Sequence, residues 1–180
     1  MEFFSTDRLI IRSFRESDAT DLFAYFSAPR VNCFADEQLT TLEEAVKDAG
    51  EKSKDQSQFA VCLKDNDLLI GNLFAMQEED TFNVGWNFNG RYEGKGYARE
   101  AAAGLFDYLF VQKEGRRIYC YVEDYNTRSQ KLCERLGMRK EGLFMEYISF
   151  VKNDDGTPRY ENTLQFAILK KEWKKLNDVI

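Results

Sequence analysis

Two glycines separated by a single residue lie between an alternating apolar segment and an alanine-rich helical pattern. Gly94 and Gly96 follow residues 82–88, where apolar and polar side chains alternate as in a half-buried strand. They precede residues 97–112, whose alanines and leucines recur at helical spacing. A glycine turn from a strand into a helix exposes backbone N–H groups at the positive end of the helix dipole, where phosphate groups bind. The segment therefore predicts a fold of strands and helices with a phosphorylated ligand at this turn.

The spacing of the glycines separates three kinds of phosphate-binding loop. A Walker A loop requires G-x-x-x-x-G-K followed by Ser or Thr, and the nearest match puts Gly96 where that hydroxyl belongs. A dinucleotide fingerprint requires a third glycine where this chain has Arg99. The remaining pattern, R-x-x-G-x-G, is filled by Arg91, Gly94 and Gly96. It resembles the acetyl-CoA pyrophosphate loop of the GNAT superfamily of N-acetyltransferases.

Two further segments carry the same resemblance. Asn126–Met138 resembles the N-x-x-[SA]-x-x-L-x-x-x-x-G-F segment of the superfamily. Thr6–Arg12 is similar to the T-x-R-L-x-L-R start of the branch that acetylates ribosomal-protein N-termini. The resemblance runs from about Thr6 to Trp173, nearly the whole chain. It implies that Asn126 hydrogen-bonds the pantetheine arm or a bound water, although asparagine also suits the first turn of a helix without any ligand.

The order of the expected elements agrees with this resemblance. Strands are expected at about residues 9–14, 58–64, 68–76, 81–88, 117–122, 138–151 and 160–170, and helices at about 18–28, 41–54, 97–112 and 126–136. We therefore expect a mixed α+β (α/β) GNAT-like fold, with a mostly antiparallel sheet of about seven strands flanked by about four helices. The chain of 180 residues suits a single acetyltransferase domain over residues 1–180.

Composition narrows the partners and the compartment. A net charge of −6 disfavours nucleic acid, which needs clustered Lys and Arg, and suits a cationic amine. No segment approaches the ~18 consecutive apolar residues of a membrane span, and the start has no signal-peptide pattern, so we expect no membrane partner. The four cysteines form no C-x-x-C pair, which favours a reduced, cytoplasmic protein without a metal site.

The chain contains no histidine, so a histidine base and the Ser-His-Asp and Cys-His arrangements are excluded. Thioester aminolysis needs none of them, because the thioester is already activated and the amine is the nucleophile. We expect acetyl-CoA-dependent acetylation of a primary amine by direct attack in a ternary complex, without an acyl-enzyme. The acceptor is either a protein N-terminus or a small-molecule amine. A homodimer is compatible with the resemblance.

Three side chains are candidates for catalysis. Ser129 matches a serine proposed in the ribosomal-protein branch to act on the CoA sulfur, and its hydroxyl would hydrogen-bond the developing thiolate. Cys133 stands where many superfamily members have the tyrosine proposed to protonate that thiolate, although a small buried cysteine is the alternative. Glu146 is the candidate base. The branch places a glutamate at the position of Ile148, and residues two apart on a strand share a face.

The cofactor is expected to meet the glycine loop, the strand before it and nearby arginines. Backbone N–H groups of the loop would bind the pyrophosphate, and the strand backbone would pair with pantetheine like an added strand. The predicted cofactor-binding residues are Trp86, Asn87, Phe88, Arg91, Gly94, Lys95, Gly96, Tyr97, Ala98, Asn126 and Arg128. The missing tyrosine and the lack of an evident base leave open a non-catalytic CoA-binding or regulatory module on the same fold. A nucleotide-binding domain that uses the same glycine loop is a third alternative.

Overall fold

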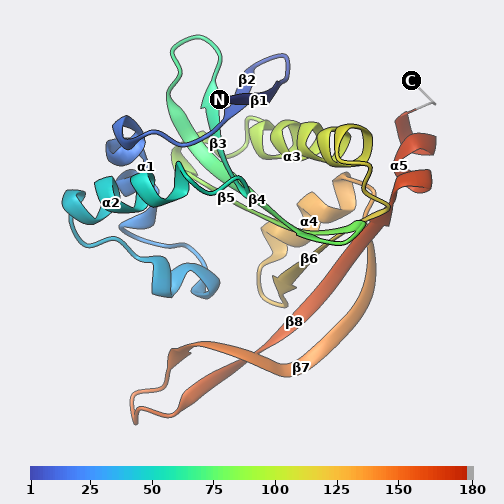
Figure 1. Cartoon of the computed structure of the whole chain (residues 1–180). Coiled ribbons are helices and arrows are strands. Elements are labelled where there is room, and N and C mark those ends of the chain that lie inside the picture. Colours follow the sequence, from blue (N-terminus) through green and yellow to red (C-terminus); the bar gives the residue numbers. More distant parts are fainter. Residues whose placement is uncertain (178–180) are drawn as a thin grey trace.

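One mixed sheet forms the centre of the computed structural model, which describes residues 1–177 (Figure 1). Its eight strands lie in the order β1-β2-β3-β4-β5-β6-β8-β7. Neighbouring strands are antiparallel except β5 and β6, which are parallel because a helix crosses over between them. The strands are β1 (Glu2–Ser5), β2 (Leu9–Arg12), β3 (Gln58–Leu63), β4 (Leu69–Glu78), β5 (Thr81–Phe88), β6 (Arg117–Glu123), β7 (Arg139–Lys152) and β8 (Pro158–Leu169).

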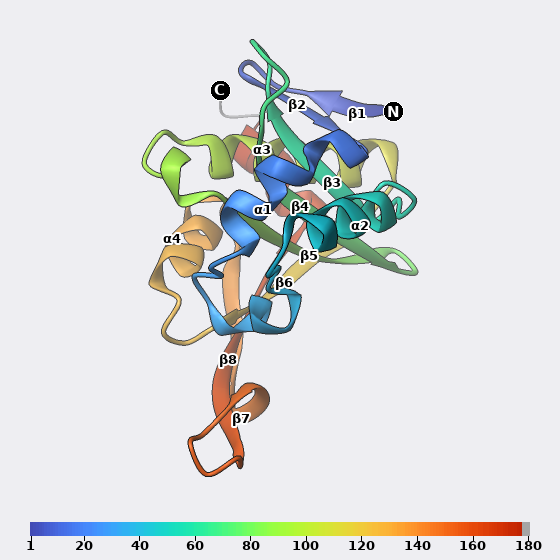
Figure 2. The ribbon, with the colours of Figure 1, turned by 90° about the vertical axis from the view of Figure 1, so that its left-hand side faces the viewer.

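Helices cover both faces of the sheet (Figures 1 and 2). The α-helices are α1 (Ala19–Phe26), α2 (Leu42–Lys52), α3 (Tyr97–Asp107), α4 (Thr127–Arg135) and α5 (Lys170–Asn177). Shorter helical segments are η1 (Glu16–Asp18), η2 (Asn32–Glu37), η3 (Gly90–Tyr92) and η4 (Tyr108–Gln112), the last a π-helical extension of α3. No helix within residues 1–177 is long and apolar enough to cross a membrane.

Alternation along β3 separates two hydrophobic clusters. Phe59 and Val61 belong to the larger cluster, which includes the apolar face of α3. Ala60 and Cys62 point the other way, into a cluster formed with α1 and α2. The apolar run from Phe59 to Cys62 is therefore buried on both faces, as its alternating large and small side chains allow.

The expected mixed α+β architecture is confirmed, with eight strands rather than about seven. The additional strand is β1, four residues that pair with β2 at the edge of the sheet. Helix α5 was also not expected, because its segment is dominated by lysines and buries chiefly Trp173. Both elements are short and gain their stability from tertiary contacts rather than from local pattern.

Strands β5 and β6 separate partway along their length. They pair only from Thr81 to Asn83 on β5, and both strands continue beyond that point without pairing with each other. Antiparallel β7 and β8 form a long ribbon that extends away from the body of the sheet (Figure 1). Within the described residues, the separation leaves one edge of β5 and one edge of β6 without strand partners, at the point where α3 and α4 begin.

Candidate active site

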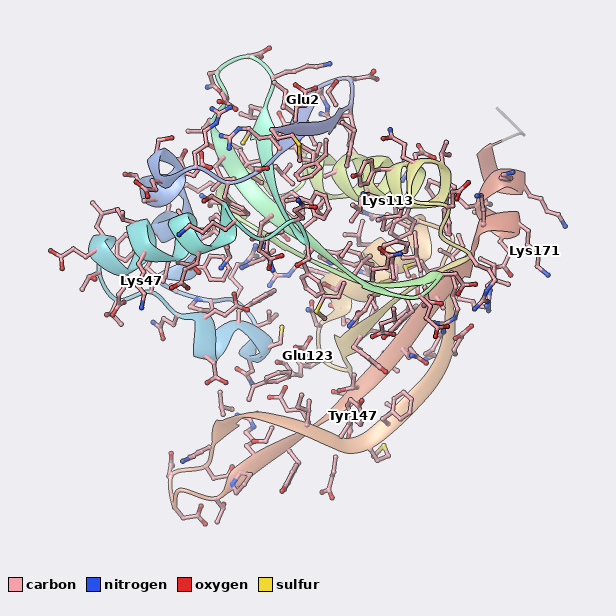
Figure 3. The ribbon with its side chains drawn as sticks, viewed as in Figure 1. Glu2, Lys47, Lys113, Glu123, Tyr147 and Lys171 are labelled. Atoms are coloured by element: carbon pink, nitrogen blue, oxygen red, sulfur yellow. The ribbon has the colours of Figure 1, made fainter. Side chains whose placement is uncertain are left out.

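The separation of β5 from β6 opens a cavity of about 880 Å³. Its walls come from these two strands, the starts of α3 and α4, η2, and the β7–β8 ribbon. Residues far apart in the chain meet here, among them Arg30, Gly96, Glu123 and Thr163. Figure 3 shows Glu123 between η2 and the β7–β8 ribbon.

The turn between β5 and α3 has the backbone geometry of an anion-binding turn. Gly94 and Gly96 have φ angles of +79° and +82°, a left-handed conformation that a Cβ disfavours. Gly96 immediately precedes α3, so the N–H groups of the first turn have no carbonyl partner within the helix. A Cβ added to Gly94 would meet no protein atom within 4 Å. The space beside the turn is therefore open to a ligand.

Arg8 and Glu100 hold this turn in place. Arg8 Nη1 donates to the carbonyl of Lys95 at 3.0 Å, and its guanidinium carbon lies 4.5 Å from the centroid of the Tyr97 ring. Glu100 pairs with Arg8 at 2.6 Å and accepts a hydrogen bond from the Thr6 hydroxyl. Burial acts to raise the pKa of Glu100, but these hydrogen bonds outweigh it and hold the pKa below its ordinary value. The turn is thus shaped before any ligand binds.

Strand β5 presents an unpaired edge to the cavity. It pairs with β4 along its whole length but with β6 only as far as Asn83. Within residues 1–177, the backbone of Trp86–Phe88 therefore has no strand partner on the cavity side. Asn87 Nδ2 is buried and has no hydrogen-bond partner among the described residues. A buried donor of this kind favours a ligand that brings its own oxygen acceptors.

The start of α4 brings Asn126 and Ser129 to the same cavity. Asn126 caps the helix, because its Oδ1 accepts the N–H of Ser129 at 3.3 Å, and its Nδ2 lies 3.5 Å from the carboxylate of Glu123. Ser129 Oγ accepts a hydrogen bond from the indole N–H of Trp86 at 3.1 Å. A hydroxyl can accept one hydrogen bond and donate another, so Ser129 can still donate its hydrogen to a second group.

Basic side chains gather near the glycine turn. Arg30 and Arg128 both pair with Glu93, at 2.6 and 3.2 Å, and Arg99 lines the cavity at the first turn of α3. All of these pairs are partly exposed, so each is weak and exchangeable. A phosphate at the turn would compete with Glu93 for the two guanidinium groups.

An acidic group lies in the cavity wall formed by β6, η2 and β8. Glu123, the last residue of β6, is 5% exposed, and Thr163 on β8 lies directly opposite it in the strand pairing. Burial and the Glu123 carboxylate raise the pKa of the Cys33 thiol, so this thiol is neutral beside the carboxylate. Neither Glu123 nor Thr163 was predicted from sequence. A glutamate that ends an apolar strand three residues before Asn126 was a usable signal for the first, and Thr163 had none.

Most of the predicted site residues line this one cavity. They are Trp86, Asn87, Phe88, Gly94, Gly96, Tyr97, Ala98, Asn126, Arg128 and Ser129. Arg91 and Lys95 do not line it. Both are exposed, and they contribute to the turn through their backbones: the Arg91 N–H bonds to Asn89, and the Lys95 carbonyl to Arg8.

The prediction that Glu146 lies on the same face as Ile148 is wrong. The argument from Ile148 assumed regular alternation, but β7 is irregular between Phe144 and Ile148, where four residue steps on β7 oppose two on β8. Glu146 has a φ of +47° within this irregularity, is exposed, and does not line the cavity. The residues between Phe144 and Ile148 lie outside the regular pairing, so simple alternation does not fix the face of Glu146. Ile148 lines the cavity, whereas Glu146 faces solvent.

Cys133 also lies away from the cavity. It is fully buried, and its Sγ is 3.5 Å from that of Cys120, where α4 covers β6. Cys120 itself lines the cavity, and Cys133 lies behind it. This position matches the alternative reading of Cys133 as a small buried side chain and not its candidacy as a catalytic acid.

The arrangement suits transfer chemistry on a ligand that carries phosphate at one end. It offers a glycine turn with the geometry of an anion-binding turn, a strand edge without a strand partner in the described residues, a serine hydroxyl and a buried carboxylate within one cavity. No group of three or more His, Cys, Asp or Glu side chains within the described range is arranged to hold a metal ion.

Comparison with known proteins adds a family to this geometry. The model of the family described as "Acetyltransferase (GNAT) domain" matches residues 8–139. The Bacillus subtilis (strain 168) protein "Uncharacterized N-acetyltransferase YnaD" is 33% identical over 172 residues, which cover 94% of this chain and 98% of that protein.

Solved structures show the same likeness. A GNAT-family acetyltransferase from Bacillus anthracis aligns over 96% of this chain and 100% of its own, with a TM-score of 0.85 and 29% identity. Ribosomal-protein-S5-alanine acetyltransferase from Vibrio fischeri aligns over 96% of this chain and 98% of its own, with a TM-score of 0.71. At 22% identity, the second comparison is a likeness of fold alone.

Proposed function

The chain belongs to the acetyltransferase (GNAT) family, and we propose that it moves the acetyl group of acetyl-CoA to a primary amine by direct attack in a ternary complex. Family membership makes it an acetyltransferase. The amine acceptor, the roles of individual residues and the organisation of residues 1–180 as a single catalytic domain are parts of the proposal. The observation that carries it is the cavity in which the glycine turn, the free edge of β5 and Ser129 meet.

Acetyl-CoA would lie along three features of this cavity. Its pyrophosphate would accept hydrogen bonds from the N–H groups that follow Gly94 and Gly96, at the positive end of α3. Arg128 and Arg99 would face the phosphates. The pantetheine amides would pair with the free backbone of Trp86–Phe88, as an added strand does.

Acetyl transfer would then need little from the protein beyond positioning. The amine nitrogen attacks the thioester carbonyl carbon, a C–N bond forms, and the C–S bond breaks with sulfur leaving as a thiolate. Ser129 would donate its hydroxyl hydrogen to this sulfur, because the indole of Trp86 already occupies a lone pair of Ser129 Oγ. A hydrogen bond that strengthens as charge develops lowers the barrier selectively.

Ligand-dependent stabilisation tests the cofactor part of this proposal. The melting temperature would be measured with acetyl-CoA, CoA, ATP and NAD, one at a time and at the same concentration; a ligand of the folded state adds roughly 2.7 kcal/mol at about 100 times its Kd. We expect stabilisation by acetyl-CoA and CoA only. A larger shift with ATP, or none with either CoA species, would contradict the assignment of the glycine turn.

Release of free CoA separates catalysis from a regulatory role. A transferase releases the CoA thiol when acetyl-CoA and a suitable primary amine are both present. A regulatory module would bind acetyl-CoA with the same thermal shift and release no thiol with any amine.

A further inference from the structure

We propose that Glu123 and Thr163 form the subsite that holds the ammonium group of the acceptor, and that Glu123 takes the proton that the amine must lose before it attacks. The inference rests on the proposed acetyl transfer. The inference narrows the acceptor to a primary amine that arrives as a cation. It also assigns Glu123 as the base, which the sequence did not reveal.

The strand register brings the two side chains together. Glu123 on β6 and Thr163 on β8 are direct partners in the antiparallel pairing, so their side chains share a face. The Cβ atoms of such partners lie about 4.5–5.5 Å apart. Both side chains line the cavity, and the two residues are 5% and 4% exposed.

Thr163 has an unmet hydrogen-bonding capacity. Its Oγ1 is buried and has no partner among the residues that the structure describes. A buried hydroxyl left unpaired is costly, and native proteins rarely keep one without a reason. A hydroxyl that lines the cavity beside a carboxylate is complementary to a ligand that donates several hydrogen bonds, as an ammonium group does.

Glu123 lacks a cation. Its contacts in the described part of the chain are to neutral groups: Asn126 Nδ2 at 3.5 Å and the thiol of Cys33. A second buried carboxylate, Glu161 on β8, accepts hydrogen bonds from Asn32 and Tyr125 and forms no ion pair within residues 1–177. Burying carboxylates without a counter-charge is expensive. The cationic head of a substrate would supply the missing charge.

The titratable groups around Glu123 within the described residues are neutral or acidic, apart from Lys52, which pairs with Glu37 at 3.7 Å. Burial, together with the Glu123 and Glu161 carboxylates, raises the pKa of the Tyr125 hydroxyl, which therefore stays neutral. Glu37 on η2 also lines the cavity, and burial raises the pKa of its carboxyl group. The arginines described above lie instead at the glycine turn and pair with Glu93.

Polar contacts connect this subsite to the proposed position of the thioester. Glu123 lies 3.5 Å from Asn126 Nδ2, Asn126 Oδ1 accepts the N–H of Ser129 at 3.3 Å, and Ser129 Oγ accepts from Trp86 at 3.1 Å. An ammonium bound by Glu123 thus lies on the same polar wall as the Ser129 hydroxyl, which is proposed to donate a hydrogen bond to the leaving sulfur.

The proposed proton transfer balances without another reagent. The ammonium gives one proton to the Glu123 carboxylate, which becomes a neutral carboxylic acid, and the nitrogen lone pair is freed to attack the thioester carbonyl. The C–N bond forms, the C–S bond breaks, and the thiolate leaves. The second amine proton and the proton on Glu123 pass to solvent or to the thiolate when products leave.

The test compares Glu123→Gln and Thr163→Val with a matched control, Glu134→Gln, on the exposed side of α4 and outside the cavity wall. Release of CoA thiol would be measured with two sources of a primary ammonium, spermidine and a short peptide with a free N-terminus. Acetyl-CoA affinity and thermal unfolding would be measured on each variant. The amine that supports thiol release shows whether the ammonium group comes from a polyamine or from a peptide N-terminus.

We expect Glu123→Gln to lower kcat/KM for the amine by about 100-fold or more, as loss of a general base does. Thr163→Val should raise the amine KM by about 10-fold, as loss of a hydrogen bond to a charged group does, with a smaller change in kcat. Acetyl-CoA affinity should stay within about twofold in both variants, and Glu134→Gln should match the wild type. Neither Glu123→Gln nor Thr163→Val should unfold more readily than the wild type, because the first removes a buried charge without a counter-charge and the second a buried hydroxyl without a hydrogen-bond partner.

Three results would overturn the subsite. The first is Glu123→Gln retaining kcat/KM within about threefold, and the second is a parallel loss of acetyl-CoA affinity, which would indicate a role in the cofactor site. The third is an unchanged amine KM in Thr163→Val, which contradicts the subsite even if Glu123→Gln does not fold. Failure of the proposed function itself differs, because the wild type would then release no thiol with either amine, with or without stabilisation by acetyl-CoA.

Discussion

At the scale of single residues, the position of a side chain relative to the cavity decides between chemically plausible candidates. Ser129 and Cys133 lie one helical turn apart on α4, and both were candidates for assisting the leaving sulfur. Ser129 lines the cavity and accepts the indole N–H of Trp86, whereas Cys133 is buried against Cys120. The assignment of the hydroxyl therefore rests on what each side chain can reach and not on acidity, in which the thiol is the stronger of the two.

Substitution of these two residues should separate their roles. Ser129→Ala should lower kcat about 10- to 100-fold and change the KM for acetyl-CoA far less, because the lost hydrogen bond matters most as the thiolate forms. Cys133→Ala should leave kcat unchanged and lower the free energy of unfolding by about 1 kcal/mol, since it removes a buried sulfur. Steady-state kinetics and denaturant unfolding measure the two effects. An unchanged kcat in Ser129→Ala would show that the role of Ser129 is purely structural.

At the scale of elements, the turn between β5 and α3 combines a left-handed backbone with open space beside Gly94. Gly94 and Gly96 occupy left-handed backbone conformations, and the second of them directly precedes the helix. A variant at such a position loses both backbone freedom and access for a ligand, so a comparison is needed that separates the two. Gly156, in the turn between β7 and β8, has a φ of +84° and, like Gly94, open space around its missing Cβ.

Gly94→Ala and Gly156→Ala form that comparison. Both should lose about 1–2 kcal/mol of stability from the left-handed conformation. Only Gly94→Ala should weaken acetyl-CoA binding, by about 10-fold or more, because its Cβ would occupy the space beside the anion-binding N–H groups. Calorimetric titration with acetyl-CoA measures the difference. Equal affinities in the two variants would show that the ligand does not approach this turn.

At the scale of the whole molecule, contacts between distant parts of the chain hold the site. Glu100 on α3 pairs with Arg8 and accepts from Thr6, linking the start of the chain to the glycine turn. Burial opposes ionisation of Glu100, but its hydrogen bonds prevail and lower its pKa. The unfolded chain, where the carboxyl has its ordinary pKa, therefore takes up this proton first as the pH falls.

Stability should consequently be complete above the ordinary carboxyl pKa, about 4.3 for glutamate, and decline as the pH falls through the lower pKa of folded Glu100. Glu100→Gln should be less stable than the wild type at neutral pH and should lose less stability on acidification. Thermal unfolding between about pH 7 and pH 3 measures both curves. Parallel curves would show that the Arg8–Glu100 pair does not couple folding to pH.

The local parts of this fold and site follow from consecutive residues. The glycine turn requires positive φ at Gly94 and Gly96, and the capping of α4 requires a short polar side chain at Asn126. Both requirements are visible in sequence because the groups that satisfy them lie within a few residues of one another. Short elements such as β1 and α5 were not predicted, because their stability comes from neighbours distant in the chain.

Sequence by itself thus determined the type of fold, the place of the glycine turn and ten of the residues that line the cavity. Only the tertiary structure decided which acidic residue enters it. Glu123 and Thr163 lie forty residues apart and meet through the register of β6 and β8, while the irregularity in β7 turns Glu146 outward. Strand register and bulges depend on pairing between distant segments, and no local pattern encodes a distance across a sheet.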